Sequence, residues 1–283
     1  MGNNEELITT YSVGVRTSLI RSESDEYQQP FYKFDKALSL KLVRMRVAMF
    51  CLLDRCREQT YRVRLSLKQM YDECGFHLDR NYKYRKTYQN IIAAIDLLVE
   101  DGFMFPLQKR IEDCRVDEQM TFYLDSEVWQ PLSMKTGTGG TRYLEHYVIF
   151  DSGKFDKLAA RPDVKLQDAL YVYLYMLSFM AYRKKLAEPE SQPRYYFAGV
   201  EKLAKGVGLS VKTVRKILTV LCDLQILHRG TADLRGDNFV KPYFYVDSVE
   251  GWERELEAAK DKINRGISGY NKNRIITGVD ILH

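Results

Sequence analysis

The chain has 283 residues, of which 45% are hydrophobic and 29% are charged, and its formal net charge is +5 at pH 7. This composition excludes a low-complexity or fibrous chain and suits a globular protein of one large or two modest domains. The mildly basic balance permits a polyanionic partner but does not establish one.

Cysteine and histidine are too scattered for the usual metal sites. The five cysteines form no C-x-x-C pair and the four histidines lie far apart, whereas structural zinc sites use close-spaced ligand pairs. We therefore expect reduced core thiols, no metal and no cofactor. No basic-then-apolar leader opens the sequence, so we also expect a cytoplasmic protein.

The first half of the chain predicts three helices followed by a hairpin. An apolar helix is expected over about 38–57, and the short helix after it ends at Gly75. An insertion, 77–86, separates this glycine turn from a third helix, whose apolar face comprises Tyr88, Ile91, Ile95 and Leu98. Apolar strands at 103–104 and 120–124 complete the hairpin.

The second half predicts the same series of elements. Its first helix, about 164–184, includes the most apolar stretch of the chain, which is too short to cross a bilayer and is predicted to be buried. A short helix ends at Gly208, and Ser210 is a natural N-cap for a third helix with Val211, Val214, Leu218 and Leu221 on one face. Strands at 226–227 and 243–246 form the second hairpin.

Two sequence matches suggest that the halves arose by duplication. FYLDSEVW (122–129) recurs as FYVDSVEGW (244–252), and FDKAL (34–38) recurs as FDKLA (155–159). The separations between the two motifs in each half differ by a single residue. Self-similarity of this kind is typical of a repeated structural unit.

We therefore divide the chain into two modules with flanking segments. A segment rich in Gly and Thr reads as the linker between the modules, and a short helix (252–263) followed by a glycine-containing tail is expected after the second. The predicted organisation is an N-terminal arm (1–30), module one (31–131), a linker (132–142), module two (143–252) and a C-terminal helix and tail (253–283).

The order helix, helix, turn, helix, hairpin resembles the winged-helix form of the helix-turn-helix. Segment 199–227 carries most of the resemblance, through Leu203-Ala204, Gly208-Leu209-Ser210, Val214 and Leu218. The predicted fold class is α+β, mainly helical with small β-hairpins, arranged as two tandem winged-helix modules. Such tandem modules are similar to the replication initiators of plasmids and phages, and this architectural resemblance implies sequence-specific binding of double-stranded DNA.

The resemblance leaves two alternatives open. A transcriptional regulator of the same architecture would show the same elements, and so would a protein-interaction or inhibitor module that does not bind DNA. An enzyme is not expected, because the glycine-rich stretch 136–140 lacks the Gly-Lys-Ser/Thr ending of a phosphate loop and no catalytic constellation is recognisable.

The predicted DNA contacts lie mainly in module two. Lysine and arginine read guanine edges or phosphates, and threonine reads either. The outward residues of the third helix are Lys212, Thr213, Arg215, Lys216 and Thr219, and the hairpin adds Arg229, Arg235 and Lys241. In module one, the insertion contributes Arg80, Lys83, Arg85 and Lys86 beside Tyr82 and Tyr84. That pattern suits phosphates or unpaired bases, unless the tyrosines pack inward.

The third helix of module one predicts an interface instead. Ile92 and Leu97 fall outside its apolar face, and leaving them in water would forfeit burial energy. We expect them to be covered by a second chain in a homodimer, by module two, or by one of the tails.

Overall fold

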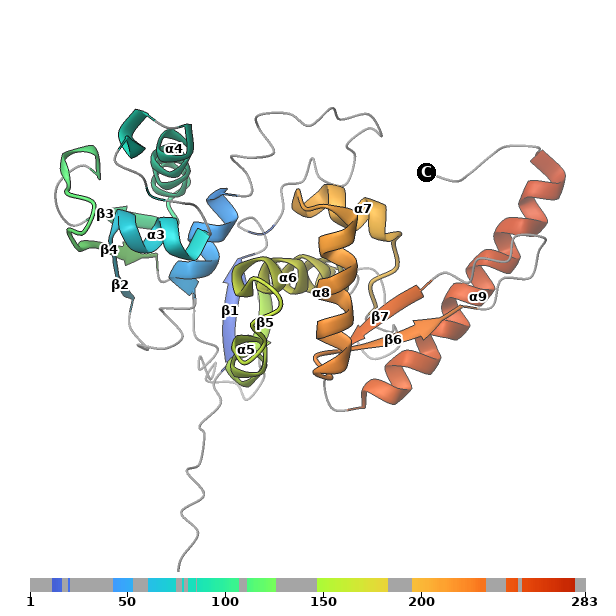
Figure 1. Cartoon of the computed structure of the whole chain (residues 1–283). Helices are drawn as coiled ribbons and strands as arrows, with labels where there is room; N and C mark the ends of the chain where they lie inside the picture. The colour runs from blue at the N-terminus through green and yellow to red at the C-terminus, as the bar shows by residue number, and fades with distance from the viewer. Residues whose placement is uncertain are drawn as a thin grey trace, which may run out of the picture. The chain divides into compact units, whose positions relative to one another are not determined.

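A computed structural model describes residues 12–16, 20, 43–52, 61–74, 78, 81–84, 86–106, 111–125, 147–182, 195–232, 243–248 and 251–277. The chain divides into two compact units. Unit 1 lies within Met1–Leu19 and Val43–Leu170, and unit 2 lies within Ile20–Leu42 and Tyr171–His283. Helices predominate and the strands form small antiparallel sheets (Figure 1), which agrees with the predicted α+β class. The predicted linker, 132–142, lies outside the described residues.

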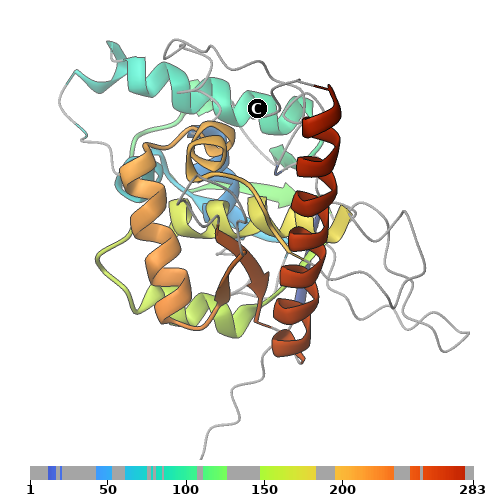
Figure 2. The ribbon, with the colours of Figure 1, turned by 90° about the vertical axis from the view of Figure 1, so that its right-hand side faces the viewer.

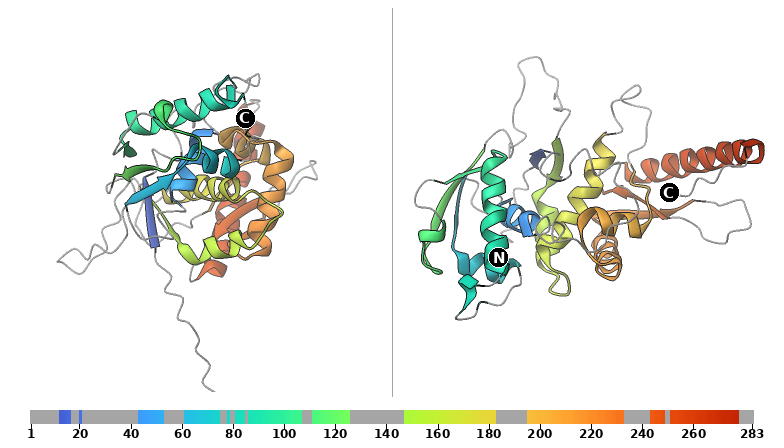
Figure 3. Two further views of the ribbon diagram at one scale, coloured as in Figure 1. Left: turned by 60° about the vertical axis from the view of Figure 1, so that its left-hand side comes forward. Right: turned by 90° about the horizontal axis from the view of Figure 1, so that it is seen from above.

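Unit 1 contains a three-stranded antiparallel sheet with the strand order β2-β4-β3. After the helical residues 43–52, its elements are β2 (Arg62–Leu65), α3 (Leu67–Cys74), η2 (Tyr82–Tyr84), α4 (Lys86–Glu100), β3 (Met104–Pro106), η3 (Ile111–Asp113) and β4 (Met120–Leu124). Figure 3 shows α4 lying beside this sheet. The inner face of the sheet buries Val63, Leu65, Met120, Phe122 and Leu124.

Local chemistry explains where α3 begins. The backbone N–H of Gln69 donates to Ser66 Oγ at 3.2 Å, and the backbone N–H of Ser66 donates to Gln69 Oε1 at 2.8 Å. This reciprocal capping box satisfies two amides that a helix N-terminus leaves without partners. The short helix therefore starts directly after β2.

A second pairing in unit 1 joins segments far apart in the sequence. β1 (Ser12–Arg16) runs antiparallel to β5 (Tyr147–Asp151), with Val15 opposite Val148 and both side chains buried. α5 (Ser152–Ala159) follows β5. Residues 12–16 fall within the N-terminal arm expected from the sequence, and this strand was not predicted.

The helix α6 (Leu166–Tyr182) contains the boundary between the units, which falls after Leu170. Its residues from Gln167 to Ser178 are buried, as predicted for this stretch. In unit 1, Asp168 accepts two hydrogen bonds from Arg46, at 2.8 and 2.9 Å. Among the described residues, no helix is long and apolar enough to cross a membrane.

Unit 2 continues with α7 (Val200–Val207), α8 (Val211–Asp223), β6 (Leu227–Thr231), β7 (Tyr243–Asp247) and α9 (Trp252–Thr277). The core between α6 and α7 depends on Gly206, because a Cβ at this position would lie 2.2 Å from Tyr175 Oη. Tyr173 Oη donates to an Asp247 carboxylate oxygen at 2.7 Å, which attaches α6 to the hairpin. Tyr196 forms an isolated antiparallel bridge with Tyr245.

The outer face of the β6–β7 hairpin is covered by α9 (Figure 2). Phe244 and Val246 pack with Ala259 and Ile263, and the imidazole of His228 stacks on the ring of Trp252 at 3.5 Å. The prediction of a short helix ending at Ile263 is wrong, because α9 continues to Thr277 through Gly266 and Gly269. Glycine costs a helix only about 1 kcal/mol relative to alanine, and the i,i+4 pair of Asp261 and Arg265 supports this part of α9.

The two units share a backbone pattern where the third helix meets the hairpin. In each, a residue with positive φ follows the helix, Gly102 in unit 1 and Gln225 in unit 2. The backbone N–H of the next residue then donates to the carbonyl of the residue five positions earlier, in the helix. The carbonyl of that next residue accepts a hydrogen bond from the backbone N–H of the residue that follows the second strand. The bonds run from Phe103 to Leu98 and from Asp125 to Phe103 in unit 1, and from Ile226 to Leu221 and from Ser248 to Ile226 in unit 2.

This pattern corrects the alignment of the repeated motif by one residue. Phe122 pairs with Val63 before α3, and the residue in that position before α7 is Tyr196, which pairs with Tyr245 rather than Phe244. Phe122 therefore faces the inner side of its sheet, whereas Phe244 faces α9. The order of elements agrees in the two units but the sequence match is out of register, so the duplication itself stays a prediction.

Candidate nucleic-acid interface

The helices α7 and α8 form a helix-turn-helix with well-defined ends. α7 ends at Gly208, which has φ 70° and whose amide donates to the carbonyl of Lys205. This left-handed backbone conformation favours glycine, because glycine has no Cβ to clash with the backbone. Ser210 then caps α8 by accepting a hydrogen bond from the Thr213 amide at 3.1 Å. The predicted turn and N-cap are confirmed.

The α8 helix separates buried apolar residues from exposed basic ones. Its buried residues are Val214, Ile217, Leu218, Val220 and Leu221. Of the predicted contacts, Lys212, Arg215, Lys216 and Thr219 are exposed, and Thr213 is half-buried. The basic residues all lie in the first half of the helix, which is the part that contacts base edges in helix-turn-helix proteins.

The outward threonines are used within the helix. Thr219 Oγ1 donates to the carbonyl of Arg215 at 3.1 Å, and Thr213 Oγ1 shares a hydrogen bond of 2.7 Å with Ser210 Oγ. These bonds were not foreseen from the sequence. The hydroxyl groups of both threonines thus already have partners within the protein. The positive charge on the outward side belongs to Lys212, Arg215 and Lys216.

An ion pair holds Arg215 in the free protein. Its Nη2 lies 3.3 Å from Glu201 Oε1 on α7, and the two side chains are 66% and 70% exposed. A solvent-exposed pair of this kind contributes only about 0–1 kcal/mol. A phosphate or a guanine edge can therefore take the place of the carboxylate at little cost.

The whole helix-turn-helix is basic. Lysine and arginine outnumber aspartate and glutamate in α7 and α8, where the former are Lys202, Lys205, Lys212, Arg215 and Lys216 and the latter are Glu201 and Asp223. In α3 and α4 the balance is reversed, with Lys68 and Lys86 against Asp72, Glu73, Asp96 and Glu100. The helices α7 and α8 therefore carry a net positive charge, whereas α3 and α4 carry a net negative charge, and only the former pair would attract a polyanion.

The hairpin next to α8 provides Arg229, which is exposed. Its guanidinium lies 4.7 Å from the ring centroid of Tyr243, itself 47% exposed. Burial raises the pKa of the nearby Cys222 thiol, although Arg229 opposes this effect. Arg235 and Lys241, the other predicted contacts in the hairpin, lie outside the described residues.

The insertion of unit 1 is only partly described. Lys83 and Lys86 are exposed, whereas Arg80 and the side chains of Tyr84 and Arg85 lie outside the described residues. The ring of Tyr82 packs edge-on against Tyr71 and Tyr88, at centroid distances of 6.5 and 5.5 Å. For Tyr82, the inward-packed alternative is therefore the one that the structure adopts.

The α4 helix buries more than its predicted apolar face. Ile92 is only 8% exposed and Leu97 is half-buried within the single chain, although both fall outside the predicted apolar face. Within unit 1, η2 and β3 both contact α4. Burial of Ile92 thus needs no second chain, and the homodimer stays an untested prediction.

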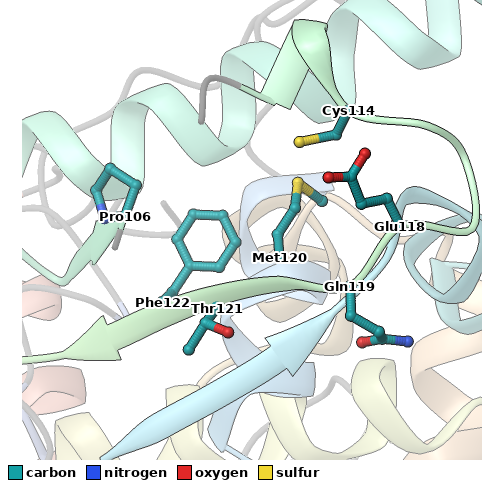
Figure 4. Close-up of a pocket in the computed structure, with 7 residues that line it drawn as sticks. All are labelled: Pro106, Cys114, Glu118, Gln119, Met120, Thr121 and Phe122. Carbon is teal, nitrogen blue, oxygen red and sulfur yellow. The ribbon is translucent and has the colours of Figure 1, made fainter. Parts of the chain in front are cut away.

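The residues around Cys114 enclose a small pocket on the inner side of the β4 strand (Figure 4). Its volume is about 10 Å³, and it is lined by Pro106, Cys114, Glu118, Gln119, Met120, Thr121 and Phe122. A cavity of that size holds about one water molecule, not a cofactor. Cys51, Cys114 and Cys222 are free thiols, and the described residues contain no cluster of metal ligands.

No protein-family model, curated protein or solved structure matches this chain. The candidate site therefore rests on the geometry of α7 and α8.

Proposed function

We propose that this chain is a tandem winged-helix protein that binds double-stranded DNA sequence-specifically through α8. The observation that carries the proposal is the exposed basic side of α8, opposite a fully buried apolar side, directly after a capped turn. The major groove of B-DNA admits an α-helix, and its base edges present distinct donor and acceptor patterns.

The basic residues divide naturally between base and phosphate contacts. Arg215 lies on the second turn of α8, and its fork of donors suits two hydrogen bonds to guanine O6 and N7. Lys212 and Lys216 flank it as point charges that neutralise phosphates. Arg229 on the hairpin reaches the backbone beside the groove, a contact that positions the protein rather than reading sequence.

We further propose that the biological role is replication initiation on a plasmid, phage or mobile element. The support is the tandem arrangement together with the charge difference between the units, since one basic helix-turn-helix reads DNA and the other module is left for a second task. A transcriptional regulator would share the DNA contacts. The two roles separate in an assay of strand opening at the bound site, which an initiator promotes and a regulator does not.

The test replaces Lys212, Arg215 and Lys216 by alanine and measures affinity for duplexes selected from a random pool. We expect a loss of several kcal/mol, since each contact is worth roughly 1–3 kcal/mol, and a smaller salt dependence. The matched control replaces Lys157, Arg254 and Arg265, three exposed basic residues outside the helix-turn-helix. Equal losses of affinity in both triple variants would show that binding depends on overall charge and not on α8. Failure to enrich any duplex would favour the protein-interaction alternative.

A further inference from the structure

The outer face of the β2-β4-β3 sheet in unit 1 gathers arginine and aromatic side chains. Along β2, exposed Arg62 and Arg64 alternate with buried Val63 and Leu65. Because paired residues of neighbouring strands share a face, the register places the residues opposite them on the same side. These are Tyr123 opposite Arg62, Thr121 opposite Arg64, and Phe105 opposite Tyr123.

The residues Arg62, Tyr123 and Phe105 form a row across the three strands, here called the arginine-aromatic row. Arg62 Nε donates to Tyr123 Oη at 2.8 Å, and its guanidinium carbon lies 5.1 Å from the centre of the tyrosine ring. Phe105, at the end of the row, is 47% exposed. The cation and the first ring are thus held in place before any ligand arrives.

The corresponding outer face of unit 2 has a different chemistry. There Gly230, Phe244 and Val246 share the face with His228, which stacks on Trp252, and a Cβ at Gly230 would lie 2.2 Å from the Phe244 ring. The helix α9 covers this face through Ala259 and Ile263. An apolar helix on the arginine-aromatic row would instead have to bury Arg62 and Arg64, and taking charged side chains out of water is costly. The face of unit 1 is therefore suited to a wet, anionic ligand.

We propose that the arginine-aromatic row, with Arg64, binds an unpaired strand of nucleic acid. Bases stack on exposed aromatic rings whatever their sequence, and arginines beside them contact the phosphates. Phe105 provides the stacking surface, Tyr123 holds the Arg62 guanidinium over its ring, and Arg64 lies one step along the sheet as a phosphate contact. Asp125 follows β4 beyond Tyr123, at the end of the strand away from Arg64. This site does not involve α8 and is independent of the duplex contact.

The experiment measures fluorescence anisotropy of a labelled oligothymidylate of about 16 nucleotides, long enough for one such site, with the full chain. We expect Phe105→Ala to weaken binding by about 5- to 100-fold. Arg64→Gln should lower the slope of log affinity against log salt by about 0.7. Tyr123→Phe keeps the ring and should have the smallest effect. The matched control is Arg254→Gln, an exposed arginine on α9, which should leave the affinity and the salt slope unchanged.

Two results would overturn the proposal. One is wild-type affinity in both Phe105→Ala and Arg64→Gln. The other is a concentration-dependent dimer that Phe105→Ala dissociates in light scattering while strand binding stays intact, since the row would then be a protein interface. If Phe105→Ala does not fold, Phe105→Leu removes the ring while keeping apolar volume. The triple alanine variant of α8 should retain oligothymidylate binding and lose duplex binding, so the two proposals fail separately.

Discussion

The third helices of the two units occupy the same place in the order of elements but present opposite surfaces. α8 buries one side and exposes Lys212, Arg215 and Lys216, whereas α4 buries Ile92 beyond its expected face and carries Asp96 and Glu100. The comparison teaches that a shared series of helices and strands does not fix a shared task. The residues left outside the core give each unit a different surface.

The sheets differ in the same way. In unit 2 the outer face of the hairpin is covered by α9, while in unit 1 the outer face of the sheet exposes Arg62, Arg64 and Phe105. The one-residue shift between the FYLDS and FYVDS motifs accompanies this difference, because it turns Phe244 towards α9 and Phe122 towards the inner core. A small change of register thus assigns the same residue type to opposite faces.

The largest expected loss of stability follows replacement of Phe122 or Phe244 by alanine. Phe122→Ala and Phe244→Ala should each cost about 3–5 kcal/mol of stability, because both side chains are fully buried. Only Phe244→Ala should also speed hydrogen exchange in the first half of α9. If Phe122→Ala loosens α9 equally, the opposite facing of the two residues is contradicted.

A somewhat smaller loss is expected at Ile92. Because the side chain is buried within one chain, Ile92→Ala should lower the free energy of unfolding by about 2–5 kcal/mol without changing the oligomeric state. Light scattering and denaturant titration at several protein concentrations measure both quantities. If the loss of stability disappears on dilution, Ile92 lies in a dimer interface and is not buried within one chain.

The buried tyrosines of unit 2 predict that the protein loses stability at alkaline pH. Burial, with a contribution from Cys222, raises the pKa of Tyr245 to about 12, and burial also raises the pKa of Tyr196. Above pH 10 the unfolded chain loses the proton while the folded chain keeps it, so stability falls as pH rises. Tyr245 alone should contribute about 2 kcal/mol to the fall between pH 10 and 12, and this part should be lost in Tyr245→Phe. An unchanged slope in that variant would exclude Tyr245 as its source.

The smallest effect concerns the ion pair that holds Arg215. Glu201→Gln should change stability by less than about 1 kcal/mol, because the pair is exposed. The same change should strengthen duplex binding severalfold, since it removes a negative charge beside the proposed contact. Glu257→Gln, an exposed carboxylate on α9, provides the matched control. Equal gains in both variants would show that only net charge matters.

Local chemistry allowed most elements to be predicted from the sequence. Ser210 and Gly208 mark the ends of α8 and α7, and apolar spacing located β4 and α6 to within a residue or two. The sequence could not reveal the pairing of β1 with β5, because it joins distant segments and has no local periodicity. The sequence left open what covers Ile92 for a related reason, since this depends on which elements surround α4.

The candidate site was predicted only in part. The exposed basic residues of α8 followed directly from its apolar face, but the internal hydrogen bonds of Thr213 and Thr219 required the structure. The outer face of the unit 1 sheet was overlooked, although arginine alternating with valine and leucine over 62–65 is a clear signal of a half-buried strand. That signal acquired meaning only when the register placed Tyr123 and Phe105 beside the arginines.

The measurement that tests the account most directly is the salt dependence of duplex binding by the wild-type chain and by the Lys212→Ala, Arg215→Ala, Lys216→Ala variant. If α8 contacts DNA, the variant should bind selected duplexes several kcal/mol more weakly, with a shallower salt slope and wild-type thermal unfolding. A folded variant that keeps the affinity, slope and sequence preference of the wild type would contradict the assignment of α8 as the DNA-reading helix.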